Sequence, residues 1–336
     1  MIYAADFKDA AGNPLRGGGD DAQCVQAAVN SAGGAGSIAL GSGPLIFKSP
    51  IIINGQIRII GDGSNVTQIN VAAPIDGDIL QFGSLQENLG WAGMYGVEIS
   101  LSSTHTGGAL IHAVNTHDFG VDDVVTWGAF NTIVQITGGS AEFISRLRNC
   151  EFNSNGPVAI LVDGYAQDVY LYDLTLGGSN TGQTGIFLQD CSGENIRDVD
   201  IISFVGYGYA AYPGAGQTVR EVFVDSMQVD GCNQGAGVQS GAIIGTTNGN
   251  NTRHHYANCW FSDNKGDGMC VGQITGVEFL HPITYVNADY GVRIVSGADY
   301  VKYSQACSGG NANGDVVDLS GASHNQIDAP FVMPIV

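Results

Sequence analysis

Charged side chains are scarce in this sequence, and basic ones are the scarcest. Only 13% of the 336 residues are charged, and 12 lysines and arginines stand against 32 aspartates and glutamates, which gives a net charge of -20. Nucleic acids and anionic membranes are bound through basic patches. The balance therefore argues against both as partners, although a few arginines in a local groove would still serve a polyanionic sugar.

Long apolar runs and paired cysteine motifs are also missing. No run of 18 apolar residues exists, so we expect no membrane insertion. The first seven residues have neither a charged n-region nor an apolar core, so we expect no Sec signal. The seven cysteines form no CxxC pair and no zinc spacing. This pattern predicts reduced cysteines in a chain that folds in a cytosol, with Cys150 and Cys259 at inward positions.

What the sequence does contain is a repeat, about 24 residues long. Each copy reads apolar, any residue, Asn or Asp, apolar, with looser copies toward the C-terminus. The third position of the successive copies falls on Asp123, Asn149, Asp173, Asp198, Ser226, Asn258, His281 and Gln305. A fixed period in this range indicates a solenoid, in which each unit buries its apolar face on its neighbours. Asn and Asp suit a bend because they tolerate the left-handed conformation.

Apolar residues alternate on both sides of that position, which predicts strand, bend, strand. A second series of expected strands, often opened by glycine, lies out of phase at 132–136, 158–162, 185–188, 241–244, 268–271 and 291–294. Neither Leu-x-x-Leu-x-Leu spacing nor helical returns are present, so a leucine-rich repeat is not favoured. The sequence therefore predicts an all-β fold, a right-handed parallel β-helix.

The first 70 residues differ from the repeats. Asp20–Ala32 reads as a short helix with an acidic N-cap region and with Ala22, Val25, Ala28 and Val29 on one face. Such a helix would cover the open end of a β-helix. We expect an N-terminal cap and first rungs over 1–70, β-helix repeats over 71–320, and a C-terminal cap or apolar tail over 321–336.

A resemblance to a known superfamily rests on this N-terminal stretch. Its order of motifs is Asp6-Phe7, Gly19-Asp20-Asp21, Val25 to Val29, Gly33-Gly34, Ile59 to Gly63 and Thr67 to Ile69. It resembles the start of pectate-lyase-like proteins, a stretch common in bacteriophage tailspikes and capsule depolymerases. The resemblance implies a right-handed β-helix that acts on a bacterial polysaccharide, a homotrimer, and a place on a virion tail or outside the cell. It does not imply one chemistry, because the fold hosts lyases, hydrolases, epimerases and non-enzymes.

The outward positions beside the repeated bend supply the candidate site. Strands in neighbouring rungs lie about 4.8 Å apart, so these positions gather acidic, basic and aromatic side chains on one face. The predicted catalytic residues are Glu151, Asp200 and Asp225, and the predicted substrate-binding residues are Arg148, Tyr172, Arg197, Trp260 and Trp127. Glu151 and Asp200 lie two expected rungs apart, on the order of 9–10 Å, which is near the spacing of an inverting glycosidase.

Other interpretations of these residues stay open. The leading hypothesis is hydrolytic depolymerisation by the paired carboxylates. The alternatives are a lyase, in which Tyr172 removes C5–H of a uronate while Arg148 or Arg197 neutralises its carboxylate, and a spike that binds glycan without cleaving it. Arg148 with Glu151, and Arg197 with Asp200, would otherwise be plain surface ion pairs.

Several further patterns are weaker. No metal site or cofactor is expected from the histidine spacing. The pair His254-His255 reads as a strand edge, and the Gly/Tyr stretch 206–216 as a protruding loop.

Overall fold

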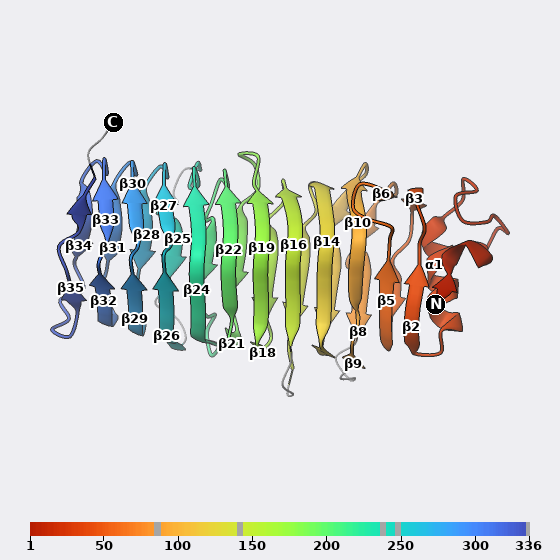
Figure 1. Ribbon diagram of the computed structural model, residues 1–336, viewed down its shortest axis with the longest axis horizontal. Coiled ribbons are helices and arrows are strands. Elements are labelled where there is room, and N and C mark those ends of the chain that lie inside the picture. Colours follow the sequence, from red (N-terminus) through yellow and green to blue (C-terminus); the bar gives the residue numbers. More distant parts are fainter. Residues whose placement is uncertain (84–88, 140–143, 236–239, 246–249, 334–336) are drawn as a thin grey trace. The chain divides into compact units, whose positions relative to one another are not determined.

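The computed structural model describes residues 1–83, 89–139, 144–235, 240–245 and 250–333. The chain is mostly β, and its parallel sheets form a β-solenoid of about 10 turns with one short helix near the N-terminus (Figure 1). It divides into two compact units, residues 1–160 with 166–170, and residues 161–165 with 171–336. The predicted parallel β-helix with an N-terminal helix is confirmed.

The repeated bend has one backbone conformation throughout. All eight residues predicted at the bend have a positive φ, between 51° at His281 and 57° at Ser226. This is the left-handed region, which Asn and Asp enter more readily than other side chains. The bend lets one strand segment run into the next at an angle, so each copy supplies two outward faces, one before the bend and one after it.

The first unit holds two parallel sheets and the helix. The sheet that contains the bend is built from β1 (Ile2–Tyr3), β2 (Ala35–Ala39), β3 (Gly43–Phe47), β5 (Gln56–Ile60), β6 (Thr67–Val71), β10 (Gly93–Leu101), β14 (Phe119–Gly128) and β16 (Ser145–Ser154). The second sheet includes β4 (Ile51–Ile53), β8 (Leu80–Gly83), β12 (Ile111–Val114) and β15 (Thr132–Thr137). Shorter elements are the 3-10 turn Ala4–Asp6, β7 (Ile75–Asp76), β9 (Leu89–Gly90), β11 (His105–Thr106), β13 (Thr116–His117) and β18 (Ala166–Gln167).

Helix α1 (Asp21–Ser31) begins where the sequence predicts it. Asp20 caps the helix by accepting a hydrogen bond from the Ala22 amide (3.2 Å), and the same carboxylate accepts bonds from the Lys48 amide (2.9 Å) and the Ser49 hydroxyl (2.6 Å). The predicted apolar face, Ala22, Val25, Ala28 and Val29, is buried. The helix is thus fixed to the β3–β4 connection by its own capping residue.

The second unit repeats the arrangement. Strands β19 (Val169–Gly177, from Leu171 on in this unit), β22 (Asn195–Ile202) and β24 (Thr218–Asp230) contain their bend residues. Strand β35 (Gln326–Ile327) pairs with β32 (Ala298–Ser304), and β26 (Asn250–Ala257), β29 (Ile274–Leu280) and β32 end just before the bend. After it come β27 (Trp260–Ser262), β30 (Ile283–Tyr285), β33 (Cys307–Gly309) and β36 (Phe331–Val332). The second sheet holds β20 (Thr184–Leu188), β23 (Tyr209–Ala211), β25 (Ser240–Ile244), β28 (Asp267–Val271), β31 (Tyr290–Ile294) and β34 (Gly314–Asp318), and β17 (Val158–Asp163) and β21 (Cys191–Ser192) complete the chain.

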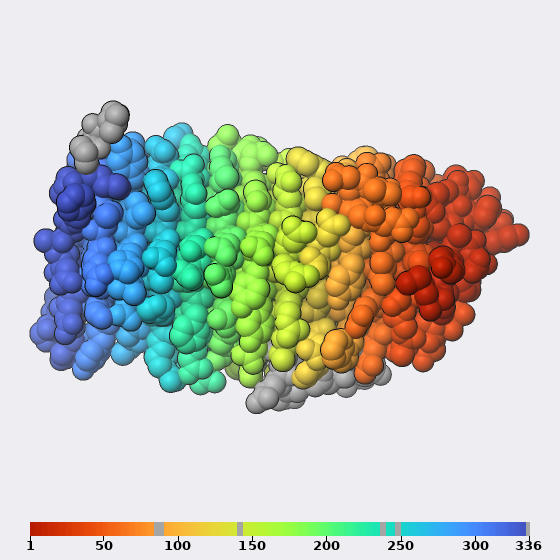
Figure 2. All heavy atoms as spheres, viewed as in Figure 1, coloured from red at the N-terminus to blue at the C-terminus, as the bar shows by residue number. Residues whose placement is uncertain are grey.

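The core follows from the strand register. Tyr256, Phe279 and Tyr303 occupy the same inward position on β26, β29 and β32, and all three are fully buried. Their ring centroids are 5.2 Å and 6.3 Å apart along this stack. Figure 2 shows the outer surface of the same turns as adjoining bands of atoms, from green to blue. Each buried ring removes a large apolar area from water, so truncation of one to alanine typically costs about 3–5 kcal/mol.

Two sequence predictions about side chains meet different outcomes. Cys150 and Cys259 are buried as predicted, with 5% and 1% of their surface exposed. The predicted protruding loop over 206–216 is wrong for Tyr209–Ala211, which form β23 in the second sheet. Tyr209 is fully buried, and its hydroxyl lies 3.1 Å from that of Tyr256. The glycines around Tyr209 had suggested a loop, although this tyrosine lies in the core.

Candidate functional site

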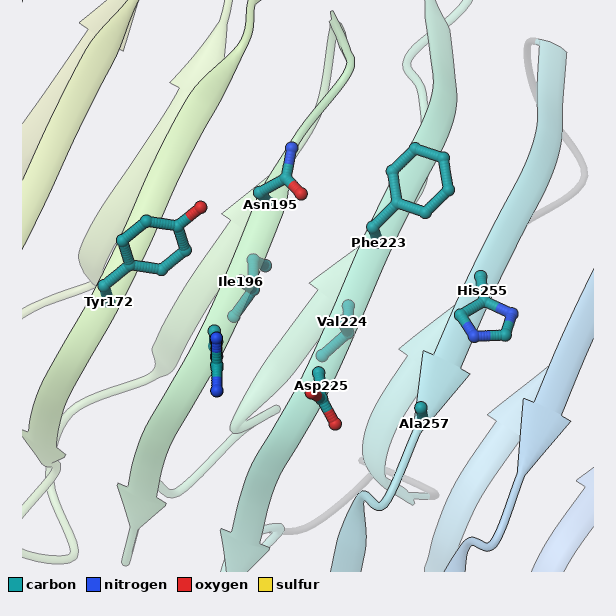
Figure 3. A pocket seen from close by; sticks show the side chains of 9 residues that line it. Tyr172, Asn195, Ile196, Phe223, Val224, Asp225, His255 and Ala257 are labelled. Atoms are coloured by element: carbon teal, nitrogen blue, oxygen red, sulfur yellow. The ribbon is translucent and has the colours of Figure 1, made fainter.

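A groove on the bend-containing sheet of the second unit brings several candidate side chains together. Its volume is about 340 Å³. It is lined by Tyr172, Asn195, Ile196, Arg197, Phe223, Val224, Asp225, His255 and Ala257. Figure 3 shows Tyr172, Asn195, Phe223, Asp225 and His255 on the outer side of the strands, while Ile196 and Val224 lie behind them. Three residues predicted from the sequence, Tyr172, Arg197 and Asp225, therefore line one hollow.

The hollow exists because of a small residue in a row of larger ones. Arg197 on β22 is in register with Asp225 on β24, and Asp225 is in register with Ala257 on β26. The next residue in this row is Leu280 on β29. The methyl side chain of Ala257, between Asp225 and Leu280, is short and so leaves space above the strand backbones. Phe223, of which 49% is exposed, forms an apolar wall two residues before Asp225.

Asp225 is held in place by polar neighbours at the bends. Its Oδ1 accepts hydrogen bonds from the side-chain amide of Asn258 (2.8 Å) and the hydroxyl of Ser226 (3.3 Å). Both donors are bend residues with positive φ. Bonds of this kind fix the orientation of the carboxylate. The repeated bend thus positions one carboxylate of the groove.

The arginines form ion pairs other than those expected. Arg197 Nε lies 3.2 Å from Asp198 Oδ2, with 65% and 50% of the two side chains exposed, so the partner is the bend residue and not Asp200. Arg148 pairs with Asp122, its register neighbour on β14, and not with Glu151. Both pairs are exposed, and pairs of this kind are individually weak. An anionic ligand would compete with them at little cost.

His255 is a groove residue that the sequence interpretation missed. Its Nδ1 lies 3.1 Å from Glu278 Oε2, and the other oxygen of Glu278 is paired with Lys302 Nζ. The hydrogen bond from Lys302 holds the pKa of Glu278 below its ordinary value, despite partial burial. These three residues share one register across β26, β29 and β32. The alternation around buried Tyr256 was the signal available in the sequence, because it points His254 and Tyr256 inward and His255 outward.

The remaining predicted residues lie elsewhere. Asp200 is exposed on β22 beyond the bend, in register with Gln228, which is in register with Trp260. Trp260 is 39% exposed, so these two residues share the second outward face of this unit. In the first unit, Trp127 is 47% exposed and Glu151 accepts a hydrogen bond from the Asn153 amide (2.9 Å). Pairing of Glu151 with Asp200 stays a prediction.

Among the residues that the structure describes, no three His, Cys, Asp or Glu side chains gather in a way that would hold a metal ion. No helix within the described ranges is long and apolar enough to cross a membrane.

The sequence matches no protein-family model and no curated protein. Solved structures of the same fold do match. The A-module of the mannuronan C-5 epimerase AlgE4 from Azotobacter vinelandii has a TM-score of 0.66 at 14% identity, covering 98% of this chain and 100% of that one. The Dettilon tailspike protein gp208 has a TM-score of 0.71 at 10% identity, covering 98% and 68%. A variant of the tailspike of E. coli bacteriophage HK620, in complex with a pentasaccharide, has 0.65 at 14%, covering 98% and 67%.

At these identities the likeness shows the fold. It confirms the expected resemblance to phage tailspikes at that level, among other proteins with a parallel β-helix.

Proposed function

We propose that this chain is a depolymerase of an acidic bacterial surface polysaccharide, and that it cleaves by β-elimination at a uronate residue bound in the groove. The observation that carries the proposal is the common lining of this groove by Tyr172, Arg197 and Asp225. They lie on β19, β22 and β24, with the arginine on the middle strand. A cation flanked by two proton-transfer groups is what elimination from a uronate requires.

The roles follow from this order. Arg197 pairs with the uronate carboxylate and so stabilises the negative charge that develops when C5 loses its proton. Asp225 accepts the C5 proton, the C4–O bond breaks as a C4=C5 double bond forms, and the Tyr172 phenol gives its proton to the leaving oxygen. Exchange with solvent then restores both groups. The sequence alone suggested Tyr172 as the base, and the groove offers a carboxylate for that step.

Phe223 and His255 line the part of the groove next to the reacting sugar. An exposed aromatic ring stacks on the apolar face of a sugar, and an imidazole whose Nδ1 is held by Glu278 presents Nε2 to a sugar hydroxyl. A polymer running across the strands would therefore meet Tyr172, Arg197 and Asp225, with Phe223 and His255 in the neighbouring row of the same face. This favours cleavage within a chain over removal of single end sugars.

Hydrolysis by Glu151, Asp200 and Asp225 is the competing mechanism. Of these three carboxylates, Asp225 lines the groove. An inverting hydrolase needs two carboxyl groups facing one glycosidic bond, about 6.5–9.5 Å apart. The elimination set is more complete within the groove, so we favour it.

A digestion experiment separates these mechanisms. Purified protein is incubated with polyuronates and acidic capsular polysaccharides, and both reducing ends and unsaturated-uronate absorbance are followed. We expect both signals to rise together. Reducing ends without that absorbance would refute elimination and favour the carboxylates. Absence of both signals, together with retention of a glycan on immobilised protein, would favour a spike that binds without cleaving.

The matched variants are Tyr172→Phe, Arg197→Gln and Asp225→Asn, with Arg220→Gln as the control. Arg220 is exposed on β24 and does not line the groove. Loss of a general acid or base typically slows the reaction roughly 100- to 10,000-fold. The control variant should retain full activity. Full activity of Asp225→Asn would place the reaction elsewhere.

Assembly and location belong to the same proposal. A homotrimer on a virion tail, or a protein outside the cell, would present such a groove to a bacterial glycan. Light scattering of the purified chain gives the oligomeric state, and a monomeric mass at micromolar concentration would contradict the trimer.

A further inference from the structure

Three arginines of the first unit gather around one tyrosine. The chain has 12 basic side chains against 32 acidic ones, so any local excess of positive charge is notable. Burial raises the pKa of Tyr95; Arg58 opposes this rise, Asp122 adds to it, and Arg146 and Arg148 oppose it further. Arg146 and Arg148 are 54% and 61% exposed. The arginine patch, defined as Arg58, Trp91, Tyr95, Arg146 and Arg148, is thus a cationic surface on an acidic protein.

The strand register explains how the patch forms. One row across the sheet reads Arg58, Gly93, Gly120, Arg146, on β5, β10, β14 and β16. The two glycines leave a flat floor between the arginines, and the Tyr95 side chain lies over it. A Cβ at Gly120 would come within 2.7 Å of the Tyr95 hydroxyl oxygen, and one at Gly93 within 3.0 Å. In the neighbouring row Asp122 lies beside Tyr95, and Arg148 follows one strand further on.

Aromatic side chains accompany the arginines. The Arg58 guanidinium lies 5.5 Å from the ring centroid of Trp91, and that of Arg146 lies 5.7 Å from the ring of Tyr170. Trp91 is 60% exposed and has a φ of 60°, an unfavourable backbone conformation for a bulky residue. An exposed indole beside a guanidinium suits a sugar that carries an acidic group.

Two arginines of the patch already have acidic partners. Arg146 Nη1 is 3.5 Å from Asp118 Oδ1 and Arg148 is paired with Asp122; the arginines are 54% and 61% exposed, and the acids 18% and 27%. Because the guanidinium ends are exposed, such pairs contribute little, and a sugar that stacks on a ring and carries a carboxylate or sulfate group can compete with the acids for the arginines.

We propose that the arginine patch is a second binding site for acidic polysaccharide and is not catalytic. Sugar rings lie on Trp91 and Tyr95, and acidic groups pair with Arg58, Arg146 and Arg148. Nucleic acid is less suited as the ligand, because it is bound through many phosphate contacts to basic side chains and the patch offers three arginines on a chain of net charge -20. The site serves to hold a polymer on the protein. It stands independently of any cleavage at Arg197.

The test measures binding of the full chain to immobilised pectate, with Arg197→Gln present in every sample so that groove cleavage does not consume the ligand. The double variant Arg58→Gln/Arg146→Gln is compared with Arg220→Gln/Arg253→Gln, which removes two exposed arginines of the second unit. We expect the Arg58→Gln/Arg146→Gln variant to bind pectate about tenfold more weakly, or weaker still, and its affinity to depend less on salt concentration. The second pair should bind as the parent does.

Trp91→Ala supplies an independent measurement. Loss of the ring should weaken binding while leaving the salt dependence unchanged, because no charge is removed. Thermal unfolding and circular dichroism of each variant establish that it is folded. Equal losses in both double variants, or unchanged binding in the first, would overturn the proposal. Equally tight binding of single-stranded DNA would overturn the assignment to polysaccharide. Cleavage is measured separately with Arg197 intact, so failure of the proposed reaction and failure of this site are distinct results.

Discussion

Acid destabilisation should depend on one buried histidine. His254 is 3% exposed, its Nδ1 lies 3.1 Å from the Tyr256 hydroxyl, and its Nε2 lies 3.5 Å from the Val219 carbonyl oxygen. Burial lowers the pKa of His254 to about 4 from the ordinary value of 6.5. The unfolded chain therefore takes up a proton at this residue at a pH where the folded chain does not. The contribution of His254 to the free energy of unfolding is complete above pH 6.5, and it is lost as the pH falls from there toward 4.

The size of the effect follows from this shift. Each pKa unit corresponds to about 1.4 kcal/mol, so the free energy of unfolding should fall by about 2 kcal/mol between pH 8 and pH 5 through His254. His254→Gln removes this titration. At pH 8 the variant should be less stable by about 1–2 kcal/mol, because the packing and the bond to Tyr256 are changed. By pH 5 the difference between the two proteins should disappear or reverse.

Guanidinium unfolding at half-unit pH intervals measures this difference directly. The other six histidines are present in both proteins, so subtracting one curve from the other isolates His254. Tyr256→Phe is the control, since it removes the hydroxyl that bonds to His254 but keeps the imidazole. It should lose stability at every pH and retain the wild-type slope. Parallel curves for the wild type and His254→Gln would refute the reasoning.

Two further predictions test burial elsewhere. Asp267 is fully buried, and Arg293 contacts it through two nitrogens, with Nε 2.8 Å from Oδ2 and Nη2 3.0 Å from Oδ1. Asp267→Asn should cost about 1–2 kcal/mol of unfolding free energy, because a charged hydrogen bond is lost while Arg293 keeps its pair with Asp289, and because burial already raises the pKa of Asp267. An equal cost for Asp299→Asn, an exposed acid paired with His324, would contradict this. Burial raises the pKa of Cys150 and Cys259 to about 12, so at pH 8 a thiol reagent should label the half-buried Cys307 in the folded protein and reach the other two only on unfolding.

The solenoid is encoded locally, which is why the sequence predicted it. The period-two alternation assigns each side chain to the core or the surface, and the residue at the bend needs only to tolerate a positive φ. All eight residues predicted at bends have a positive φ, and Asp123, Asn149 and Ser226 are examples. The helix that begins after Asp20 could be predicted for the same reason, since its cap and apolar face lie within a dozen residues.

The candidate site is encoded only in part. Tyr172, Arg197 and Asp225 were predicted because they precede bends, and they do line one groove. His255 was missed because it lies three residues before the bend at Asn258 and not directly beside it, although the alternation around Tyr256 turns it outward. Tyr209 was assigned to a loop because a glycine-rich segment hides its strand pairing with β20 and β25.

The sequence by itself determined that strands stack, where each copy bends and which side chains face outward, because these properties depend on neighbours in the chain. Only the tertiary structure decided which outward side chains meet, because the turns differ in length and the register between strands fixes the contacts. That register pairs Arg197 with Asp225 and His255 with Glu278, and it sets two glycines between Arg58 and Arg146. The hollow at Ala257 and the floor under Tyr95 arise from small residues whose effect appears when neighbouring turns are packed side by side.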